Sequence, residues 1–363
     1  MPEDSSTKAR VEQVEEQQKE KALVPSERMW SRWWGTPGAI RSRKTPRPGE
    51  FSTYDPPRRD PVASAISAAA VWIRKQRDKR AAPAADVVAR ILDRLGTAES
   101  GVAAANVVVI VAHPDDEAIG AGAVLRAFPN VTIVHVTDGA PMDKGYAEAK
   151  GFASREEYAA QRRKEVVAAL GIVGISSERI RGLGIVDGEA AWHLVELTRM
   201  IAELLDELKP EIVLTHPYEG GHSDHDSTAF AVHLATGMLV REGRHAPVIL
   251  ELTSYHNYRG RRRLFSFLPF GNRRVKTVRL SREERRLKRE MFRHFTSQAA
   301  LLETFPVSIE RFREAPRYLF TVPPHEGQLD YERLCKKMTG AEWRANADQA
   351  LQMLRTRRSF PGI

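Results

Sequence analysis

The sequence contains a single cysteine, Cys335, among its 363 residues. One cysteine can form neither an intrachain disulfide nor a zinc site built from several cysteines, so both kinds of cross-link are excluded. A chain of this length buries enough apolar surface to fold without them. The lack of a disulfide framework favours a reducing compartment, and we expect a cytoplasmic protein.

Long hydrophobic runs are also missing. The longest predominantly apolar stretch covers residues 62–73, and its 12 residues are too few to span a bilayer. Residues 1–21 mix acidic and basic side chains and lack the apolar centre of a secretory signal peptide. We therefore expect neither a transmembrane segment nor a signal peptide, and peripheral contact with a membrane surface stays open.

The first 60 residues have few apolar side chains and many charged, proline and glycine residues. Such a composition offers little burial to offset the entropy of ordering, so we expect most of this extension to be disordered. The exception is a cluster of three of the chain's six tryptophans, Trp30, Trp33 and Trp34. The cluster predicts a short segment packed on the main domain, with a docking anchor for another protein or a membrane as the alternative.

From residue 106 onward, buried-strand patterns alternate with helical patterns. Runs rich in β-branched residues predict strands at 106–113, 131–139, 179–183, 211–216 and 246–255. Helical spacing predicts helices at 117–128, 154–171, 189–208, 223–241 and 281–302. This alternation predicts a Rossmann-like α/β domain, a mostly parallel sheet with helices on both faces. We expect this domain over 105–330, a helical preface over 61–100 and a C-terminal helical tail over 331–363.

Positive charge is unevenly distributed. Lys and Arg exceed Asp and Glu by nine over the whole chain, whereas residues 259–293 alone hold fourteen Lys/Arg against three Glu. This segment predicts a solvated helix face with its flanking loop, and a surface for anionic partners is the alternative. Because few aromatic residues are interleaved and no known nucleic-acid-binding module is present, the sequence argues against nucleic-acid binding.

No glycine-rich phosphate loop follows the first predicted strand, where a nucleotide-binding fold would carry one. Residues 112–117 instead read Ala-His-Pro-Asp-Asp-Glu, and three carboxylates at this place attract a cation and repel phosphate. Gly120 and Gly122 come too late to form such a loop, and we expect them to serve helix–sheet packing.

A second polar cluster, Gly-Gly-His-Ser-Asp-His at 220–225, follows the predicted strand that ends at His216. Both clusters therefore lie at the carboxyl ends of strands, on one rim of the predicted sheet. Two histidines and one carboxylate with an open fourth position are typical of catalytic zinc, which lowers the pKa of a bound water toward neutrality. A helix cap would explain the first cluster alone, but not the pair.

The segment VVVIVAHPDDEAIGAGAVL and the later HSDH resemble the two motifs of the LmbE-like, or PIG-L, de-N-acetylases, and the similarity extends over about 105–330. The resemblance implies a zinc-dependent deacetylase that removes acetyl from a small, and in some cases anionic, N-acetylated amino sugar or its conjugate. Fe²⁺ suits the same ligands. Two alternatives stay open: an amidase acting on a non-sugar metabolite, and a metal-binding scaffold without catalysis.

The resemblance also implies roles for six residues. It gives three metal ligands, His113, Asp116 and His225. Asp115 matches the general base, and His222 matches the histidine that stabilises the oxyanion and protonates the leaving amine, with Asp224 orienting it. Some sugar-conjugate members carry a tyrosine where this chain has Gly220, so their substrate contacts do not transfer. Four further polar residues receive no assigned role, namely Asp138, Asp187, His216 and His294.

Overall fold

The computed structural model describes Leu92, Asp93, Leu95 and residues 106–128, 130–270, 274–334 and 337–356. The predictions for the first 60 residues, the tryptophan cluster and most of the helical preface lie outside this part, as does Cys335. Of the predicted preface, Leu92 and Leu95 are described, and both are buried in the hydrophobic core.

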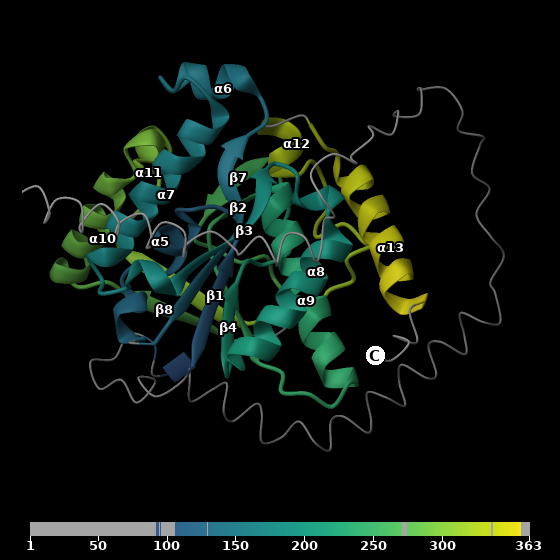
Figure 1. Cartoon of the computed structure of the whole chain (residues 1–363). Coiled ribbons are helices and arrows are strands. Elements are labelled where there is room, and N and C mark those ends of the chain that lie inside the picture. Colours follow the sequence, from purple (N-terminus) through teal and green to yellow (C-terminus); the bar gives the residue numbers. More distant parts are fainter. Residues whose placement is uncertain are drawn as a thin grey trace, which may run out of the picture. The chain divides into compact units, whose positions relative to one another are not determined.

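A sheet forms the centre of the fold (Figure 1). It has seven strands in the order β3-β2-β1-β4-β5-β9-β8. The first five strands in this order are mutually parallel, and β9 runs antiparallel to both of its neighbours, β5 and β8, which confirms the predicted mostly parallel sheet. The strands are β1 (Val107–Val111), β2 (Thr132–Pro141), β3 (Ile180–Asp187), β4 (Ile212–Thr215), β5 (Val248–Leu252), β8 (Val275–Arg279) and β9 (Ile309–Glu314). A separate antiparallel hairpin consists of β6 (Tyr255–Tyr258) and β7 (Arg261–Leu264).

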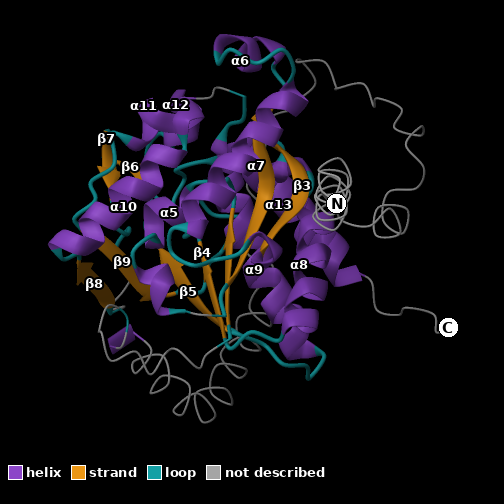
Figure 2. Ribbon diagram, turned by 60° about the vertical axis from the view of Figure 1, so that its left-hand side comes forward, coloured by secondary structure: helices purple, strands orange, loops and turns teal. Residues whose placement is uncertain are grey.

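Helices cover both faces of the sheet, as Figure 2 shows. One face carries α5 (Asp116–Ala121), α7 (Arg155–Gly171) and α10 (Arg282–His294), and the other carries α8 (Leu194–Leu208) and α9 (Ser223–Arg241). The remaining helices are α6 (Lys144–Ala149), α11 (Ala299–Leu302), α12 (Asp330–Leu334) and α13 (Gly340–Thr356). Among the described helices, none is both long enough and apolar enough to cross a membrane.

Strand β1 shows why the sheet needs two helical layers. Val107, Val109 and Val111 pack into the cluster that includes α5 and α7, whereas Val108 and Ile110 pack into the cluster of α8 and α9. Successive side chains of a strand point to opposite faces, so an uninterrupted apolar run requires apolar partners on both sides. Each of these buried side chains contributes about 1.5–3 kcal/mol through the area it removes from water.

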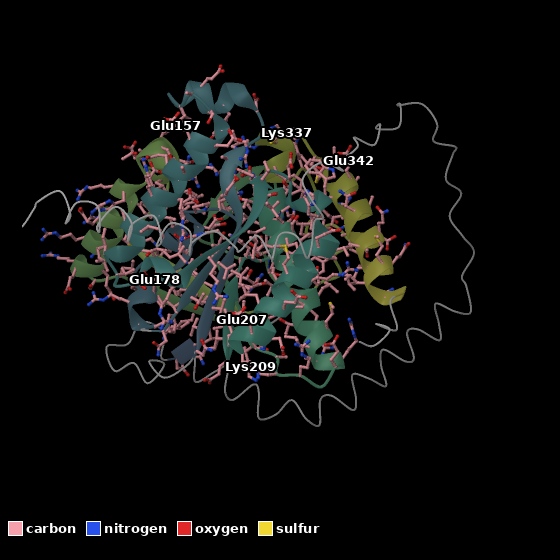
Figure 3. All side chains as sticks on the ribbon, in the orientation of Figure 1. Glu157, Glu178, Glu207, Lys209, Lys337 and Glu342 are labelled. Carbon is pink, nitrogen blue, oxygen red and sulfur yellow. The ribbon has the colours of Figure 1, made fainter. Side chains whose placement is uncertain are left out.

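The order of the strands creates a crevice between β1 and β4. The chain leaves β1 through α5 toward β2 on one side, and leaves β4 through α9 toward β5 on the other. In open α/β sheets the loops separate at such a switch point, and ligands bind there beyond the carboxyl ends of the strands. Figure 3 shows Lys337 toward that end of the sheet and Lys209 near the opposite end.

Three predicted helices are interrupted in the structure, and in the first of them a buried side chain captures backbone groups. Residues 117–128 form α5 and then a separate 3₁₀ turn, η1 (Val124–Ala127), because the Glu310 carboxylate accepts the N–H groups of Ala123 and Val124. The predicted helices at 189–208 and 281–302 are likewise interrupted at His193 and Phe295. Gly120 does serve packing, since a Cβ there would lie 2.5 Å from the side chain of Leu252.

Residues 259–293 differ most from the prediction of a helix face and loop. Only α10 is helical, and the segment also contributes β7 and β8. Strand β7 escaped prediction because it consists of three arginines and one leucine, without the apolar alternation of a half-buried strand.

Candidate metal and catalytic site

Two tight turns bring the predicted site residues to the crevice. After β1, the backbone N–H of His113 donates to the carboxylate of Asp116 at 2.8 Å, and α5 begins at Asp116. After β4, His222 is the N-cap of α9, and its Nδ1 accepts the backbone N–H of Asp224 at 3.2 Å. Asx-type and N-cap hydrogen bonds of this kind fix side chains at the start of a helix.

The first group of possible metal ligands comprises His113, Asp116 and His225, whose ligand atoms all lie within 4.8 Å of one another. Asp116 Oδ2 lies 3.2 Å from His113 Nδ1, and Asp116 Oδ1 lies 3.2 Å from His225 Nε2. Zinc bonds of about 2.0–2.1 Å in a tetrahedron put neighbouring ligand atoms about 3.3 Å apart, so the spacing suits such an ion. His225 Nε2 is buried without a hydrogen-bond partner, and binding of a metal ion by this nitrogen would explain that.

Other side chains hold these ligands in place. His113 Nε2 faces the carboxylates of Asp224 and Asp187, each at 3.2 Å. His216 stacks on His225 with ring centroids 3.9 Å apart, and its Nε2 accepts the backbone N–H of Ala112 at 3.0 Å. Such outer contacts fix the ring orientation and tautomer of metal-binding histidines.

Asp115 directly precedes Asp116 in the sequence but is not one of the possible ligands of this group. It is 4% exposed, and its Oδ2 accepts a hydrogen bond from the Arg162 guanidinium at 3.2 Å. Burial raises the pKa of Asp115 to about 6, although the charge of Arg162 opposes that rise. A carboxylate with a pKa in this range can accept and return a proton near neutral pH.

His222 and Asp224 differ in geometry from the pairing that the sequence predicted. The Asp224 carboxylate lies 3.9 Å from His222 Nδ1 but 3.2 Å from His113 Nε2, so its closer histidine partner is His113. Asp224 reaches His222 through its backbone N–H instead. Burial, assisted by His113, lowers the pKa of His222 to about 4.

Of the residues left unassigned from the sequence, Asp187 and His216 lie in the site. Asp187 is the last residue of β3, and the carboxyl end of a parallel strand is the signal that could have identified it. Arg162 was missed, because nothing in the sequence of α7 marks it as facing Asp115. Asp138 pairs with Arg155, and His294 at the end of α10 is not among the possible metal ligands of the described residues.

A cavity of about 320 Å³ opens beside His222 and Asp187. Its wall combines residues of the β2 and β3 ends with Tyr331, Lys337 and Met338 from the C-terminal part of the chain. Cavities of this size take small molecules, and aromatic and charged wall groups orient them.

The loop of residues 216–222 joins β4 to α9, the helix that carries His225, and we call it the metal-ligand loop. On its far side it packs against the hairpin and β9. The Tyr255 ring lies 5.5 Å from that of His225, and a Cβ on Gly221 would meet the Tyr255 carbonyl at 2.2 Å. Glu219, three residues before His222, accepts a hydrogen bond from the buried Arg313 at 3.0 Å. The loop can therefore move little without disturbing the second half of the molecule.

Comparisons with known proteins point to one family. The family described as PIG-L, GlcNAc-PI de-N-acetylase, matches residues 108–236. A probable N-acetyl-alpha-D-glucosaminyl L-malate deacetylase 2 of Bacillus subtilis is 30% identical over 155 residues, which cover 41% of this chain and 68% of that protein. The 1D-myo-inositol 2-acetamido-2-deoxy-alpha-D-glucopyranoside deacetylase 2 of Catenulispora acidiphila is 30% identical over 151 residues, covering 35% of this chain and 50% of that protein.

Among solved structures, a deacetylase of teicoplanin biosynthesis is 20% identical, with a TM-score of 0.46, and the match covers 57% of this chain and 96% of that one. The chain thus matches between half and about two thirds of these two curated relatives' length. Both sequence motifs fall inside the family match at 108–236, and they supply the two turns that meet at the crevice. This chain belongs to the PIG-L family, as its two motifs predicted.

Proposed function

We propose that this chain is a metal-dependent hydrolase that removes the acetyl group from a small N-acetylated amino sugar or its conjugate, in the cytoplasm. The observation that carries the proposal is the convergence of His113, Asp116 and His225 beside Asp115, at the sheet's switch point. The two relatives are named as deacetylases of N-acetyl-alpha-D-glucosaminyl L-malate and of 1D-myo-inositol 2-acetamido-2-deoxy-alpha-D-glucopyranoside, which supports an N-acetylated sugar as the substrate class.

The residues that would hold the metal are His113, Asp116 and His225. A bound divalent cation would polarise the acetyl carbonyl and increase the acidity of the attacking water. We propose zinc, because two histidines and one carboxylate with a further open position are its usual catalytic set, and Fe²⁺ suits the same donors.

We assign Asp115 as the general base that accepts a proton from the attacking water. Its Oδ2 is held by Arg162, which leaves Oδ1 to accept that proton. With a pKa of about 6, Asp115 can then return the proton to the nitrogen as the C–N bond breaks. The products are acetate and the free amine of the sugar.

His222 is better suited to hydrogen-bond donation than to carrying a charge. A pKa of about 4 leaves its ring neutral at pH 7. Because Nδ1 accepts the Asp224 N–H, the ring proton belongs on Nε2, where it can donate to the oxyanion that forms during attack. We therefore assign oxyanion stabilisation to His222 and protonation of the amine to Asp115, which revises the role predicted from the sequence.

The test is acetate release from a panel of N-acetylated compounds by chelated protein and by the same protein reloaded with Zn²⁺ or Fe²⁺. We expect release from N-acetylglucosamine or its glycosides by the loaded protein alone. N-acetylated amino acids and polyamines form the non-sugar arm. Release confined to that arm would identify an amidase of another substrate class, and no release from either arm would contradict the proposal.

A further inference from the structure

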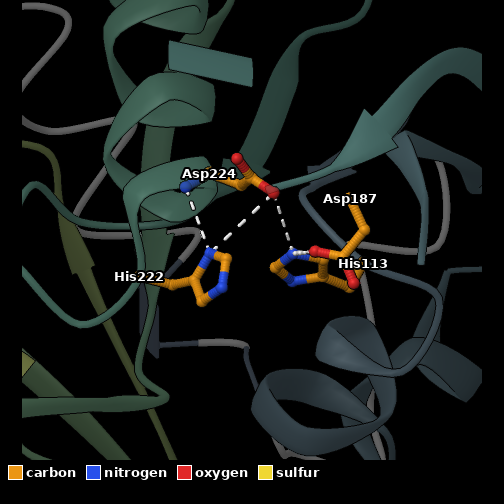
Figure 4. A group of neighbouring side chains, drawn as sticks. All are labelled: His113, Asp187, His222 and Asp224. Atoms are coloured by element: carbon orange, nitrogen blue, oxygen red, sulfur yellow. Dashed lines mark hydrogen bonds and ion pairs between the residues drawn. The ribbon is translucent and has the colours of Figure 1, made fainter. Parts of the chain in front are cut away.

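The cavity of about 320 Å³ beside the catalytic residues takes its walls from separate parts of the chain. On the catalytic side it is lined by His222 and Asp187, whose side chains converge with those of His113 and Asp224 in a second cluster of site residues (Figure 4). Helix α6 contributes Tyr146 to the wall, and the segment from α12 to α13 contributes the rest of it. A molecule bound in this cavity therefore lies beside the possible metal ligands.

Away from the catalytic residues, the wall is mainly apolar and aromatic. Tyr331 and Met338 are buried side chains of the C-terminal segment. The two charged wall residues on this side, Asp143 and Lys337, are exposed and opposite in sign. A wall of this kind suits an uncharged ring that has apolar faces and polar groups at its edge.

Tyr146 is the aromatic residue of α6 that lines this cavity. It is 40% exposed, although the Tyr158 ring lies 5.9 Å away and Lys150 Nζ lies 5.8 Å from its ring centroid. Burial raises the pKa of Tyr146 to about 12, and Tyr158 and the charge of Asp187 add to the rise. The side chain thus extends from α6 toward Asp187 on the catalytic side, and it is uncharged at neutral pH.

Helix α6 holds Tyr146 in a fixed position. Ala147, the next residue, is buried in one apolar cluster with Tyr158. At the C-terminal end of the helix, Lys150 Nζ donates to the Ser297 carbonyl at 2.9 Å. An aromatic ring that is held in place before binding loses little conformational freedom when a ligand packs against it.

The C-terminal part of the wall is fixed to the metal-ligand loop. The backbone N–H of Asp330 donates to the Gly220 carbonyl at 2.8 Å, and the Trp343 indole donates to the Ser223 carbonyl at 3.2 Å. Tyr331 follows Asp330 directly, so its place in the wall is set by the same contact. The cavity is therefore a preformed space and not a gap between independently mobile parts.

We propose that Tyr146 is a substrate-binding residue that distinguishes N-acetylated sugars from acetamides without a ring, by packing its own ring against the C–H face of the sugar. A pyranose has C–H groups on its faces and hydroxyl groups around its edge, and an aromatic side chain can cover such a face while the hydroxyl groups stay hydrated. An acetamide without a ring has no such face. The role in turnover rests on the proposed function, but binding of the sugar to metal-free protein does not.

The binding test titrates the full chain, freed of metal by chelation, with methyl N-acetylglucosaminide and with N-acetylethanolamine, an acetamide without a ring. Ligand-observed NMR gives the Kd of each. Tyr146→Ala should weaken binding of the glycoside at least about tenfold, because a large apolar contact is lost. Tyr146→Phe keeps the ring and should stay within about threefold of wild type. Binding of N-acetylethanolamine should be the same in all three proteins.

The matched control is Tyr258→Ala, which removes a half-buried tyrosine of β6 that contacts His325 and does not line the cavity. It should bind the glycoside as wild type does. Tyr146→Leu is a second variant without the ring and should also weaken glycoside binding, so the test does not depend on the folding of one variant.

An unchanged Kd for the glycoside in folded Tyr146→Ala would overturn the proposal. So would an equal loss for the glycoside and N-acetylethanolamine, which would indicate a general disturbance of the site, or wild-type protein that binds no glycoside. In an active preparation, kcat/KM for the glycoside should fall with its affinity in Tyr146→Ala. Glycoside binding by a metal-loaded chain that releases no acetate would instead refute the proposed function and leave Tyr146 as a sugar-binding residue.

Discussion

Two regions of the molecule make different contributions to the same site. Residues 106–241 supply the possible metal ligands, and residues 248–356 supply part of the cavity wall. The first region contains β1 to β4 and the three possible metal ligands, His113, Asp116 and His225. The second contains the antiparallel strands and the C-terminal helices, and it supplies Tyr331, Lys337 and Met338 to the cavity wall. The chemistry is thus concentrated in the region that matches the family, while the second region shapes what can bind.

The two regions are joined by buried charges. Arg313 on β9 donates to Glu251 on β5 at 2.6 Å and to Glu219 in the metal-ligand loop at 3.0 Å. On the hairpin, His256 Nδ1 lies 3.0 Å from the other oxygen of Glu219. The second region therefore also positions the loop of the first that ends at His222 and leads into α9, the helix of His225.

The largest effect should come from removing a metal ligand of the first region. His225→Ala should lose most of the bound metal and with it acetate release, because two ligands hold an ion much less firmly than three. Elemental analysis of the purified variant measures this directly. His245→Ala is the control, since that ring contacts the Pro210 carbonyl away from the site. Full metal occupancy in His225→Ala would remove it from the ligand set.

Asp115→Asn should separate metal binding from catalysis. The amide cannot take a proton from water, so kcat should fall by about 10²- to 10⁴-fold while the metal content stays that of wild type. Steady-state kinetics on metal-analysed samples decide the matter. Near-normal turnover in a loaded variant would show that Asp115 is not the base.

The contact between the two regions should be revealed by Arg313→Met. This change leaves Glu219 and Glu251 buried without their cation and should lower the free energy of unfolding by about 3–5 kcal/mol. Urea denaturation measures the loss. Arg311→Met on the same strand, where the side chain is half-buried, is the control. If both variants unfold alike, the buried network does not join the regions.

The fall in activity at low pH should be controlled by the protonation of Asp115 in the first region. Since the base must be ionised to accept a proton, kcat/KM should fall as the pH drops below about 6. Arg162 opposes the raised pKa of Asp115, so Arg162→Gln should move this acid limb to higher pH, and Arg162→Lys should move it less. An acid limb that stays in place in Arg162→Gln would show that another group controls it.

The smallest effect is expected from the exposed arginines of the hairpin. Arg261 and Arg263 are exposed, whereas Arg262 pairs with Asp330 and stacks over the Tyr255 ring at 4.5 Å. If the hairpin attracts anionic substrates, the double change of Arg261 and Arg263 to Gln should lower kcat/KM on the order of two- to fivefold at low salt, and less as salt rises. An equal kcat/KM at both salt concentrations would leave these arginines as surface charges.

The division between the regions also explains how far the sequence could predict the structure. The parallel strands were predictable because an apolar run such as 107–111 has only one way to be buried on both faces. Helix α9 was predictable from its helical spacing. His113, Asp116, His222 and His225 could be grouped because motifs at strand ends must meet on one rim. Arg162 could not, since a single charged residue in a helix carries no spacing signal, whereas the place of Asp187 at the carboxyl end of β3 is a signal that could have identified it. The hairpin depends on tertiary contacts such as the buried His256–Glu219 pair, and β8 depends on its pairing with β9, which no local pattern records.

The most direct test of the whole account is a titration of chelated protein with Zn²⁺, with acetate release from N-acetylglucosamine or a glycoside of it measured at each addition. We expect no release without metal and a linear rise in release that ends at one equivalent of Zn²⁺ per chain. Metal-free protein that releases acetate as fast as loaded protein would contradict it.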